Sequence, residues 1–189
     1  MKILAIIFLC VTLCLRVLVA NSQNEKIENF TLTNAFNNAR VSLYDFSNAK
    51  VVVVIFTSNH CPYSKLYENR IITLAKQFES SNVQFLTINS NSGSNDFVEE
   101  MKKKSYPFPY LSDKQQKVCN QFGAAKTPEA FVLHNKNGNF YLVYKGAIDD
   151  NPQVENDVNN HYLKNAIEAI INGSQPALKE KRATGCVIK

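Results

Sequence analysis

The sequence feature that most constrains the fold is an apolar run followed closely by a cysteine and a proline. Residues 50–56 read KVVVVIF, and all but the first are apolar. Continuous β-branched residues are typical of a strand buried on both faces of a sheet. Pro62, directly after Cys61, suits the first position of a helix. The apolar face of that helix would consist of Leu66, Ile71, Leu74, Ala75 and Phe78.

The rest of the chain predicts further strands alternating with helices. Strands are expected at residues 83–88, 130–134 and 140–144. Helices are expected at residues 96–104, 113–122 and 162–171. Asn137-Gly138 is typical of a hairpin turn, and Asp113 and Gly123 would begin and end the second of these helices. This order predicts one α/β domain over residues 27–172 with a central mixed sheet, followed by an irregular tail at residues 173–189.

Residues 1–22 differ in composition from the rest of the chain. Lys2 precedes a long apolar stretch that contains Arg16 as its only further charge, and Ala20-Asn21-Ser22 provides a small-residue ending. This layout predicts a secretory signal peptide, and therefore a periplasmic or secreted protein without stable membrane anchoring. The alternative is an uncleaved anchor through residues 3–20, because the stretch is nearly long enough to cross a bilayer. Arg16 and the polar segment after the stretch favour cleavage.

Charge and cysteine content limit the function classes. Removal of residues 1–22 would lower the formal net charge from +5 to +3, because Lys2 and Arg16 would be lost. A charge this small and evenly spread gives no reason to expect nucleic-acid binding. The cysteines that would remain are Cys61, Cys119 and Cys186. An odd number in an exported protein indicates a reactive thiol or an intermolecular bond rather than a disulfide framework.

Cys61 is the strongest candidate for a reactive residue. Its expected position at a helix start places backbone N–H groups and the positive end of the helix dipole beside the sulfur. His60 can add positive charge near neutral pH, and Pro62 fixes the first turn of the helix. These effects favour the thiolate, which is the nucleophilic form of cysteine. An isolated cysteine can also be buried and inert, but the junction of strand and helix argues against that here.

A second signal lies far along the chain at Thr127-Pro128-Glu129, immediately before the apolar residues 130–133. A proline at the start of a strand can follow a cis peptide bond in a tight turn. It can equally be an ordinary trans proline at the edge of a sheet. The residues alone leave these two alternatives open.

Four short segments carry a resemblance to a family of redox proteins. The sequence resembles the thioredoxin superfamily, and most closely a redoxin branch grouped with alkyl hydroperoxide reductases and thiol-specific antioxidants. The matching segments are N-H-C-P-Y at residues 59–63, T-P-E at residues 127–129, G-x-I-D-D at residues 146–150 and G-C-x-I-K at residues 185–189. The resemblance implies a thioredoxin fold, with helices on both faces of the sheet and a cis peptide bond that faces Cys61. It also implies that a substrate would contact Thr127, Pro128, Pro62 and Tyr63.

The sequence departs from the family pattern at residues that would assist Cys61. Ser64 stands where thioredoxins have their second cysteine, and Ile55 stands where they place a buried Asp. Peroxiredoxins have a proline at the position of Val54 and an arginine near the reactive sulfur. Here the nearest arginine of the helix, Arg70, lies more than two turns along it. Disulfide exchange and peroxide reduction therefore both stay open.

Ser64 cannot complete a thiol cycle, although its hydroxyl can donate a hydrogen bond to the Cys61 thiolate. A mixed disulfide or a sulfenic acid at Cys61 needs a second thiol for turnover. Cys186 is the expected resolving thiol, because it lies in a tail long enough to fold back and Gly185 allows a close backbone approach. Cys119 is expected to be a small core residue. An external thiol is the remaining alternative.

The sequence thus predicts an exported thiol oxidoreductase with antioxidant activity, in which Cys61 is the nucleophile. The expected partners are protein or small-molecule thiols and disulfides, with hydroperoxides as a further substrate class. No cofactor and no metal is expected, since neither the histidines nor the acidic turn at Asp149-Asp150 has the ligand spacing of a metal site. The alternative is a non-enzymatic binding module that holds cysteine-containing partners without turnover, which Ser64 and Ile55 would favour.

Overall fold

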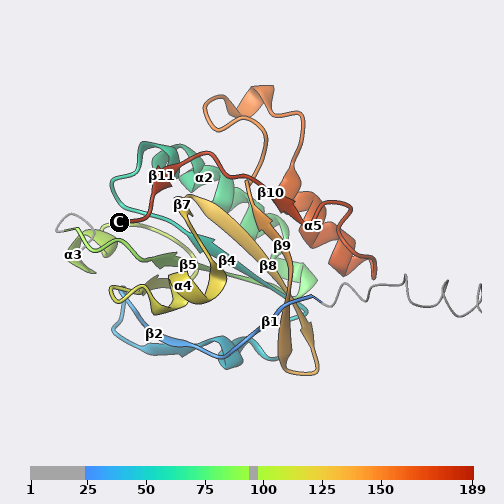
Figure 1. Cartoon of the computed structure of the whole chain (residues 1–189), viewed down its shortest axis with the longest axis horizontal. Helices are drawn as coiled ribbons and strands as arrows, with labels where there is room; N and C mark the ends of the chain where they lie inside the picture. The colour runs from blue at the N-terminus through green and yellow to red at the C-terminus, as the bar shows by residue number, and fades with distance from the viewer. Residues whose placement is uncertain (1–23, 94–97) are drawn as a thin grey trace, which may run out of the picture.

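A computed structural model describes residues 24–93 and 98–189, with one large sheet between two layers of helices (Figure 1). The expected signal peptide at residues 1–22 lies outside the described residues. The elements, in chain order, are β1 (Lys26–Ile27), β2 (Thr31–Asn34), β3 (Arg40–Ser42), η1 (Leu43–Phe46), β4 (Val51–Phe56), α2 (Pro62–Gln77), η2 (Glu79–Ser81), β5 (Val83–Asn89), α3 (Val98–Met101), β6 (Tyr110–Ser112), α4 (Lys117–Phe122), β7 (Lys126–Thr127), β8 (Glu129–Lys136), β9 (Asn139–Gly146), η4 (Glu155–Asp157), α5 (Tyr162–Ile171), β10 (Glu180–Lys181) and β11 (Cys186–Val187).

The large sheet is mixed, as the sequence predicts. Its strand order is β1-β9-β8-β4-β5-β6-β2-β3, and β10 pairs with β9. β5 is parallel to both of its neighbours, β4 and β6, whereas β8 is antiparallel to β4. The β8–β9 hairpin is also confirmed, with φ of 55° at Asn137 and 82° at Gly138 in its turn. The central strand, β4, therefore has a parallel neighbour on one side and an antiparallel neighbour on the other.

β4 is buried on both faces. All of its residues have an exposed fraction of 0%. Its odd-numbered residues pack in the core formed with α2 and α5, and its even-numbered residues pack in the core that includes α4. Successive side chains of a strand point to opposite faces, so one apolar run supplies both cores. The continuous apolar run of the sequence is thereby accounted for.

Two predicted helices are shorter in the structure. α4 begins at Lys117 instead of Asp113, because residues 113–116 form a turn that ends with Gln116 at a φ of 55°. The Asp113 carboxylate still assists the helix, since it accepts the backbone N–H of Cys119 at 2.8 Å. The helix predicted at residues 96–104 is represented by α3, whose bounds are Val98–Met101, and residues 94–97 are not among the described ones.

The sequence pattern does not predict β1, β2, β3, β6 and β7. Each of these strands has between two and four residues. A stretch this short cannot display the alternation that identifies a strand. Their pairing depends on neighbours supplied by the tertiary fold.

The tail at residues 173–189 is irregular over most of its length, but it contains two short strands that the sequence does not predict. β10 pairs in parallel with β9, and β11 pairs antiparallel with β7. Figure 1 shows the red C-terminal segment running from beside α5 past α2 to the C-terminus. A β-carbon at Gly146 would overlap the carbonyl oxygen of Lys181, so only glycine lets the tail lie this close to β9. Backbone pairing needs no apolar periodicity, which is why the sequence pattern does not reveal it.

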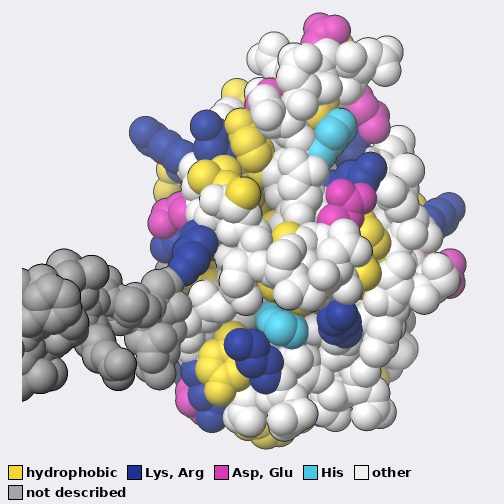
Figure 2. Space-filling model, turned by 90° about the vertical axis from the view of Figure 1, so that its right-hand side faces the viewer, with side chains coloured by type: hydrophobic (Ala, Val, Ile, Leu, Met, Phe, Trp, Pro, Cys, Tyr) yellow, Lys and Arg dark blue, Asp and Glu magenta, His cyan; other side chains and the backbone are white. Residues whose placement is uncertain are grey.

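The surface carries charges of both signs. On the face shown in Figure 2, Lys and Arg side chains are interspersed with Asp and Glu side chains, and the apolar side chains form small separate groups. Over residues 24–93 and 98–189, no helix has the length and apolar character that crossing a membrane requires.

Candidate active site

Cys61 lies at the N-terminus of α2, just beyond the end of β4. It is the N-cap residue, with an extended backbone and no capping hydrogen bond from its side chain. The first N–H groups of a helix lack intrahelical acceptors, and the dipole of this 16-residue helix has its positive end at Cys61. The turn before it is held from β6, since the Tyr110 hydroxyl donates to the side-chain oxygen of Asn59 at 3.0 Å. This placement favours the thiolate in the reduced protein.

Cys61 forms a disulfide with Cys186. The two residues are separated by 125 positions in the sequence, and their Cα atoms lie 5.9 Å apart. Cys186 belongs to β11 and lies opposite Thr127 of β7. The Cys61 sulfur lies 3.0 Å from the carbonyl oxygen of Thr127. The structure therefore brings together the two cysteines that the sequence analysis selects, while their roles as nucleophile and resolving thiol stay predictions.

The turn that faces this disulfide contains Pro128. The Thr127–Pro128 peptide bond is cis, which confirms the expectation drawn from the family resemblance. Both residues are buried. A β-carbon at Gly185 would overlap the carbonyl oxygen of Thr127 and would lie 2.8 Å from its carbonyl carbon. Gly185 thus allows the close backbone approach that the sequence analysis expects, and the partner surface is the cis-proline turn.

Ser64 lies inside the first turn of α2. Its side chain is buried, and its hydroxyl oxygen accepts the backbone N–H of Ser58 at 3.3 Å. A hydroxyl can accept one hydrogen bond and donate another. Donation from Ser64 to a Cys61 thiolate therefore stays a prediction.

The other residues expected around Cys61 are more accessible. His60 is exposed, and its backbone N–H donates to the hydroxyl oxygen of Ser58 at 3.3 Å. Pro62 is exposed and Tyr63 is half-buried. Their contact with a substrate, and the electrostatic effect of His60, stay predictions.

Cys119 is the free cysteine of the described chain, and it is buried in the core that includes α4. Its thiol lies 3.3 Å from the carbonyl oxygen of Ala124, to which it donates. Burial raises the pKa of Cys119, and the negative charge of Asp113 raises this pKa further. The expectation that Cys119 is a small core residue is confirmed.

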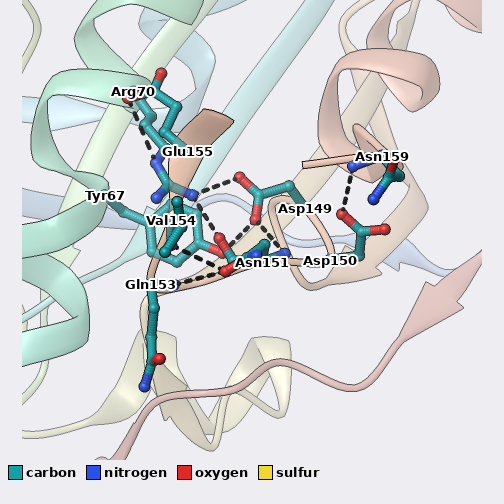
Figure 3. Close-up of polar contacts among 9 residues, drawn as sticks. All are labelled: Tyr67, Arg70, Asp149, Asp150, Asn151, Gln153, Val154, Glu155 and Asn159. Carbon is teal, nitrogen blue, oxygen red and sulfur yellow. Dashed lines mark hydrogen bonds and ion pairs between the residues drawn. The ribbon is translucent and has the colours of Figure 1, made fainter. Parts of the chain in front are cut away.

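Arg70 binds the loop that follows β9 (Figure 3). Its guanidinium donates to the Asp149 carboxylate at 3.0 Å and to the carbonyl oxygen of Asn151 at 2.7 Å. The other carboxylate oxygen of Asp149 accepts the hydroxyl of Tyr67 at 2.5 Å. Burial raises the pKa of Tyr67, and the hydrogen bond to Asp149 raises it further, so Tyr67 stays a neutral donor. The positive charge of Arg70 is therefore engaged by Asp149.

The sequence predicts a turn at Asp149-Asp150 but gives no indication of this ion pair. The turn is confirmed, since the Asp150 carboxylate accepts the backbone N–H of Asn159 at 3.0 Å and the side-chain amide of Asn160 at 2.7 Å. Arg70 and Asp149 are 79 positions apart, and no local pattern links residues at that separation. The G-x-I-D-D segment is the one signal in the sequence that marks the position of Asp149.

A cavity of about 190 Å³ lies beside the cis-proline turn. The body of the domain lines it with Tyr67, Pro128 and Ile148, and the tail lines it with Lys181, Arg182 and Ala183. The tail thus forms one wall of the cavity beside Pro128.

Thioredoxin-like oxidoreductases place their reactive cysteine where a central strand passes into a helix, opposite a cis-proline. This chain has the same arrangement and is a thiol oxidoreductase. A family model supports the assignment, since the AhpC/TSA family matches residues 24–148. This match covers more than half of the chain, and the protein belongs to the AhpC/TSA family.

Solved bacterial structures have the same fold. An uncharacterized conserved protein from Geobacillus kaustophilus is 32% identical with a TM-score of 0.81, and the match covers 88% of this chain and 91% of that one. A hypothetical protein from Sinorhizobium meliloti 1021 is 28% identical with a TM-score of 0.80, over 89% of this chain and 94% of that one. A protein from Chlorobium tepidum, described as thiol:disulfide interchange protein DsbE, is 16% identical with a TM-score of 0.59, over 80% of this chain and 96% of that one. At this identity, the last match shows the fold alone. No curated protein sequence matches the chain.

The first prediction concerns the buried ion pair. Arg70→Met would leave Asp149 as an uncompensated buried charge, so the free energy of unfolding should fall by about 3–5 kcal/mol. Lys102→Met is the matched control, because its partner Glu99 is on the surface and such pairs contribute about 0.2–1 kcal/mol. Urea denaturation of both variants measures the difference. Equal losses in the two variants would contradict a structural role for Arg70.

The second prediction concerns Cys119. Its raised pKa leaves little thiolate near neutral pH, whereas Cys61 lies at the N-terminus of α2, which favours the thiolate once the disulfide is reduced. In the reduced, folded protein, iodoacetamide should therefore label Cys119 much more slowly than Cys61 and Cys186. Peptide mapping at successive times measures the three rates, and labelling in denaturant is the control. Labelling of Cys119 in the folded protein as fast as in denaturant would show the prediction to be wrong.

Proposed function

We propose that this protein is an exported thiol:disulfide oxidoreductase in which Cys61 is the nucleophile and Cys186 is the resolving thiol. The observation that carries this proposal is the Cys61–Cys186 disulfide beside the cis-proline turn. An intramolecular disulfide between a helix N-terminal cysteine and a second cysteine is the oxidised state of a two-cysteine cycle. It also accounts for the serine at position 64, where thioredoxins have their second cysteine. In the proposed cycle the second thiol comes from Cys186 in the tail.

The proposed cycle begins with both thiols reduced. The Cys61 thiolate attacks one sulfur of a substrate disulfide, so that a mixed disulfide forms and the other substrate sulfur leaves as a thiolate. The Cys186 thiolate then attacks the Cys61 sulfur, which forms the Cys61–Cys186 bond and releases the substrate cysteine as a thiolate. Both released thiolates take up protons from the solvent. Two electrons pass from the protein to the substrate, and an external dithiol returns the protein to its reduced state.

Peroxide reduction is the second candidate, and membership of the AhpC/TSA family favours it. In that cycle the Cys61 thiolate attacks a peroxide oxygen and becomes a sulfenic acid, while the other oxygen leaves as an alcohol or water. Cys186 then forms the same disulfide and releases water. Two features support disulfide exchange over this route. Val54 lies in the interior of β4 where peroxiredoxins have a proline, and Arg70 is engaged by Asp149.

The third prediction separates the two substrates. Reduced protein is mixed with one equivalent of bis(2-hydroxyethyl) disulfide or of hydrogen peroxide, and the cysteine products are followed by mass spectrometry. The disulfide should rapidly yield the Cys61–Cys186 bond in the unchanged chain. Cys186→Ser should instead accumulate a mixed disulfide at Cys61, and Cys119→Ser should behave as the unchanged chain.

The peroxide arm of the same experiment tests the second candidate. Rapid sulfenic acid formation at Cys61 in Cys186→Ser would establish the peroxide cycle and the antioxidant role. Reaction of Cys61 with both reagents at the rate of a free cysteine would argue against either catalytic function. It would leave the binding module without turnover as the remaining interpretation.

Residues 1–22 would direct the export of the chain. The basic start, apolar stretch and small-residue ending support a cleaved signal peptide. A disulfide is also a stable feature in oxidising compartments, whereas reducing compartments keep thiols reduced.

The fourth prediction tests export directly. When the full chain is produced in a Gram-negative bacterium, mature protein should be recovered in the periplasmic fraction with an N-terminus close to residue 22. Leu9→Arg, which interrupts the apolar stretch, should retain the uncleaved chain in the cytoplasm. Uncleaved protein in the membrane fraction would indicate the anchor through residues 3–20 instead.

A further inference from the structure

The C-terminal tail occupies the backbone edge beside the reactive sulfur. β7 pairs with β11 in a two-stranded sheet of its own, apart from the large sheet. Cys186 lies opposite Thr127, and Val187 lies opposite Lys126. The pairing continues beyond the strand, since the N–H of Ile188 donates to the carbonyl oxygen of Ala125 at 3.1 Å. A strand edge of this kind can accept any extended segment of suitable shape.

Besides the disulfide, backbone hydrogen bonds and the packing of Ile188 hold the tail to this edge. Residues 184–189 are all exposed or half-buried. At the end of the tail, the carbonyl oxygen of Lys189 accepts the backbone N–H of Ser92 at 2.9 Å. Solvent-exposed backbone hydrogen bonds with little buried apolar area open at low free energy. When the disulfide is reduced, the edge of β7 can therefore become available to another strand.

We propose that an extended segment of a partner protein, carrying a disulfide-bonded cysteine preceded by glycine, pairs with β7 in the place that β11 occupies. This inference rests on the proposed function, because it names the substrate of the same site. The tail then serves two purposes: Cys186 supplies the resolving thiol, and its strand displaces the partner from β7 as the disulfide closes.

The requirement for glycine follows from the geometry at Gly185. A β-carbon there would overlap the carbonyl oxygen of Thr127 and would lie 3.3 Å from the nitrogen of Pro128. Both atoms belong to the backbone of a buried turn, so neither can move aside as a flexible side chain could. A partner strand in the same register meets the same obstacle at the residue before its cysteine.

The neighbouring tail positions indicate further preferences. Ala183 is buried against the cavity beside Pro128, which favours a small residue three positions before the cysteine. The side chain of Val187 is largely exposed, so the position after the cysteine should be permissive. Ile188 packs against the core that includes α4, which favours an apolar residue at the second position after the cysteine. The partner pattern is therefore small-x-Gly-Cys-x-apolar.

The reaction with such a partner consists of the same two thiol–disulfide exchanges as the proposed cycle. The Cys61 thiolate forms a bond with the partner's cysteine sulfur and breaks the partner's disulfide, whose second sulfur leaves as a thiolate and takes up a proton. The Cys186 thiolate then forms the Cys61–Cys186 bond and releases the partner's cysteine as a thiolate. An external dithiol supplies the two electrons for the next cycle.

The fifth prediction tests the glycine preference. The reduced Cys186→Ser protein, in which a mixed disulfide cannot be resolved, is mixed with the peptide Ala-Thr-Gly-Cys-Val-Ile whose cysteine is blocked by 2-mercaptoethanol. The matched peptides carry alanine in place of glycine, or lysine in place of valine. The lysine peptide should react as fast as the first, and the alanine peptide about tenfold more slowly or worse, because one inserted methyl group in a tight contact is strongly unfavourable.

The reaction with bis(2-hydroxyethyl) disulfide is the control for the chemistry of Cys61. Equal rates for the glycine and alanine peptides, together with a normal rate for this small disulfide, would overturn the partner pattern and leave the proposed function intact. Failure of Cys61 to react with any of them faster than a free cysteine would overturn both.

Displacement by the tail is tested in a chain that keeps Cys186. Gly185→Ala should hinder the return of β11, so the mixed disulfide with the glycine peptide should persist longer than in the unchanged chain. Gly93→Ala is the matched control, because a β-carbon at Gly93 would meet nothing within 4 Å. Equal lifetimes in the two variants would contradict the displacement of the partner by β11.

Discussion

The burial of β4 on both faces is the constraint on which the rest of the structure depends. Its side chains supply both cores, and its two edges pair with β5 and β8. Because the strand is held from every side, the turn that follows it has a fixed position, and so has the N-terminus of α2. Cys61 therefore lies in a fixed position at the positive end of the helix dipole, which favours the thiolate that the proposed function needs.

The tail completes this site from the opposite end of the chain. Two glycines make that possible, since Gly146 lets β10 lie against β9 and Gly185 lets the following segment lie against the cis-proline turn. Cys186 reaches Cys61 as part of a paired strand, not as a loose end. The cysteine bonded to Cys61 thus comes from the C-terminal tail instead of from α2, and the Ser64 hydroxyl oxygen accepts the backbone N–H of Ser58.

The buried charges serve the architecture rather than the chemistry. Arg70 and Asp149 join α2 to the loop after β9, and Tyr67 donates to the same carboxylate (Figure 3). The Asp149 carboxylate and the Arg70 guanidinium depend on each other. Burying either charge without its partner would cost a large free energy of desolvation. This interaction fixes the loop that borders the cavity beside Pro128.

The sequence by itself determined the parts of this protein that depend on local pattern: the buried run of β4, Pro62 at the start of α2, the Asn137-Gly138 hairpin, and Cys61 at the junction. The tail length and Gly185 pointed to Cys186, and the family resemblance added the cis bond before Pro128. Only the tertiary structure decided the short strands, the pairing of the tail and the partner of Arg70. The reason is physical: periodicity and turn chemistry act over a few residues, whereas backbone pairing at an edge and a buried ion pair join positions that are distant in the sequence.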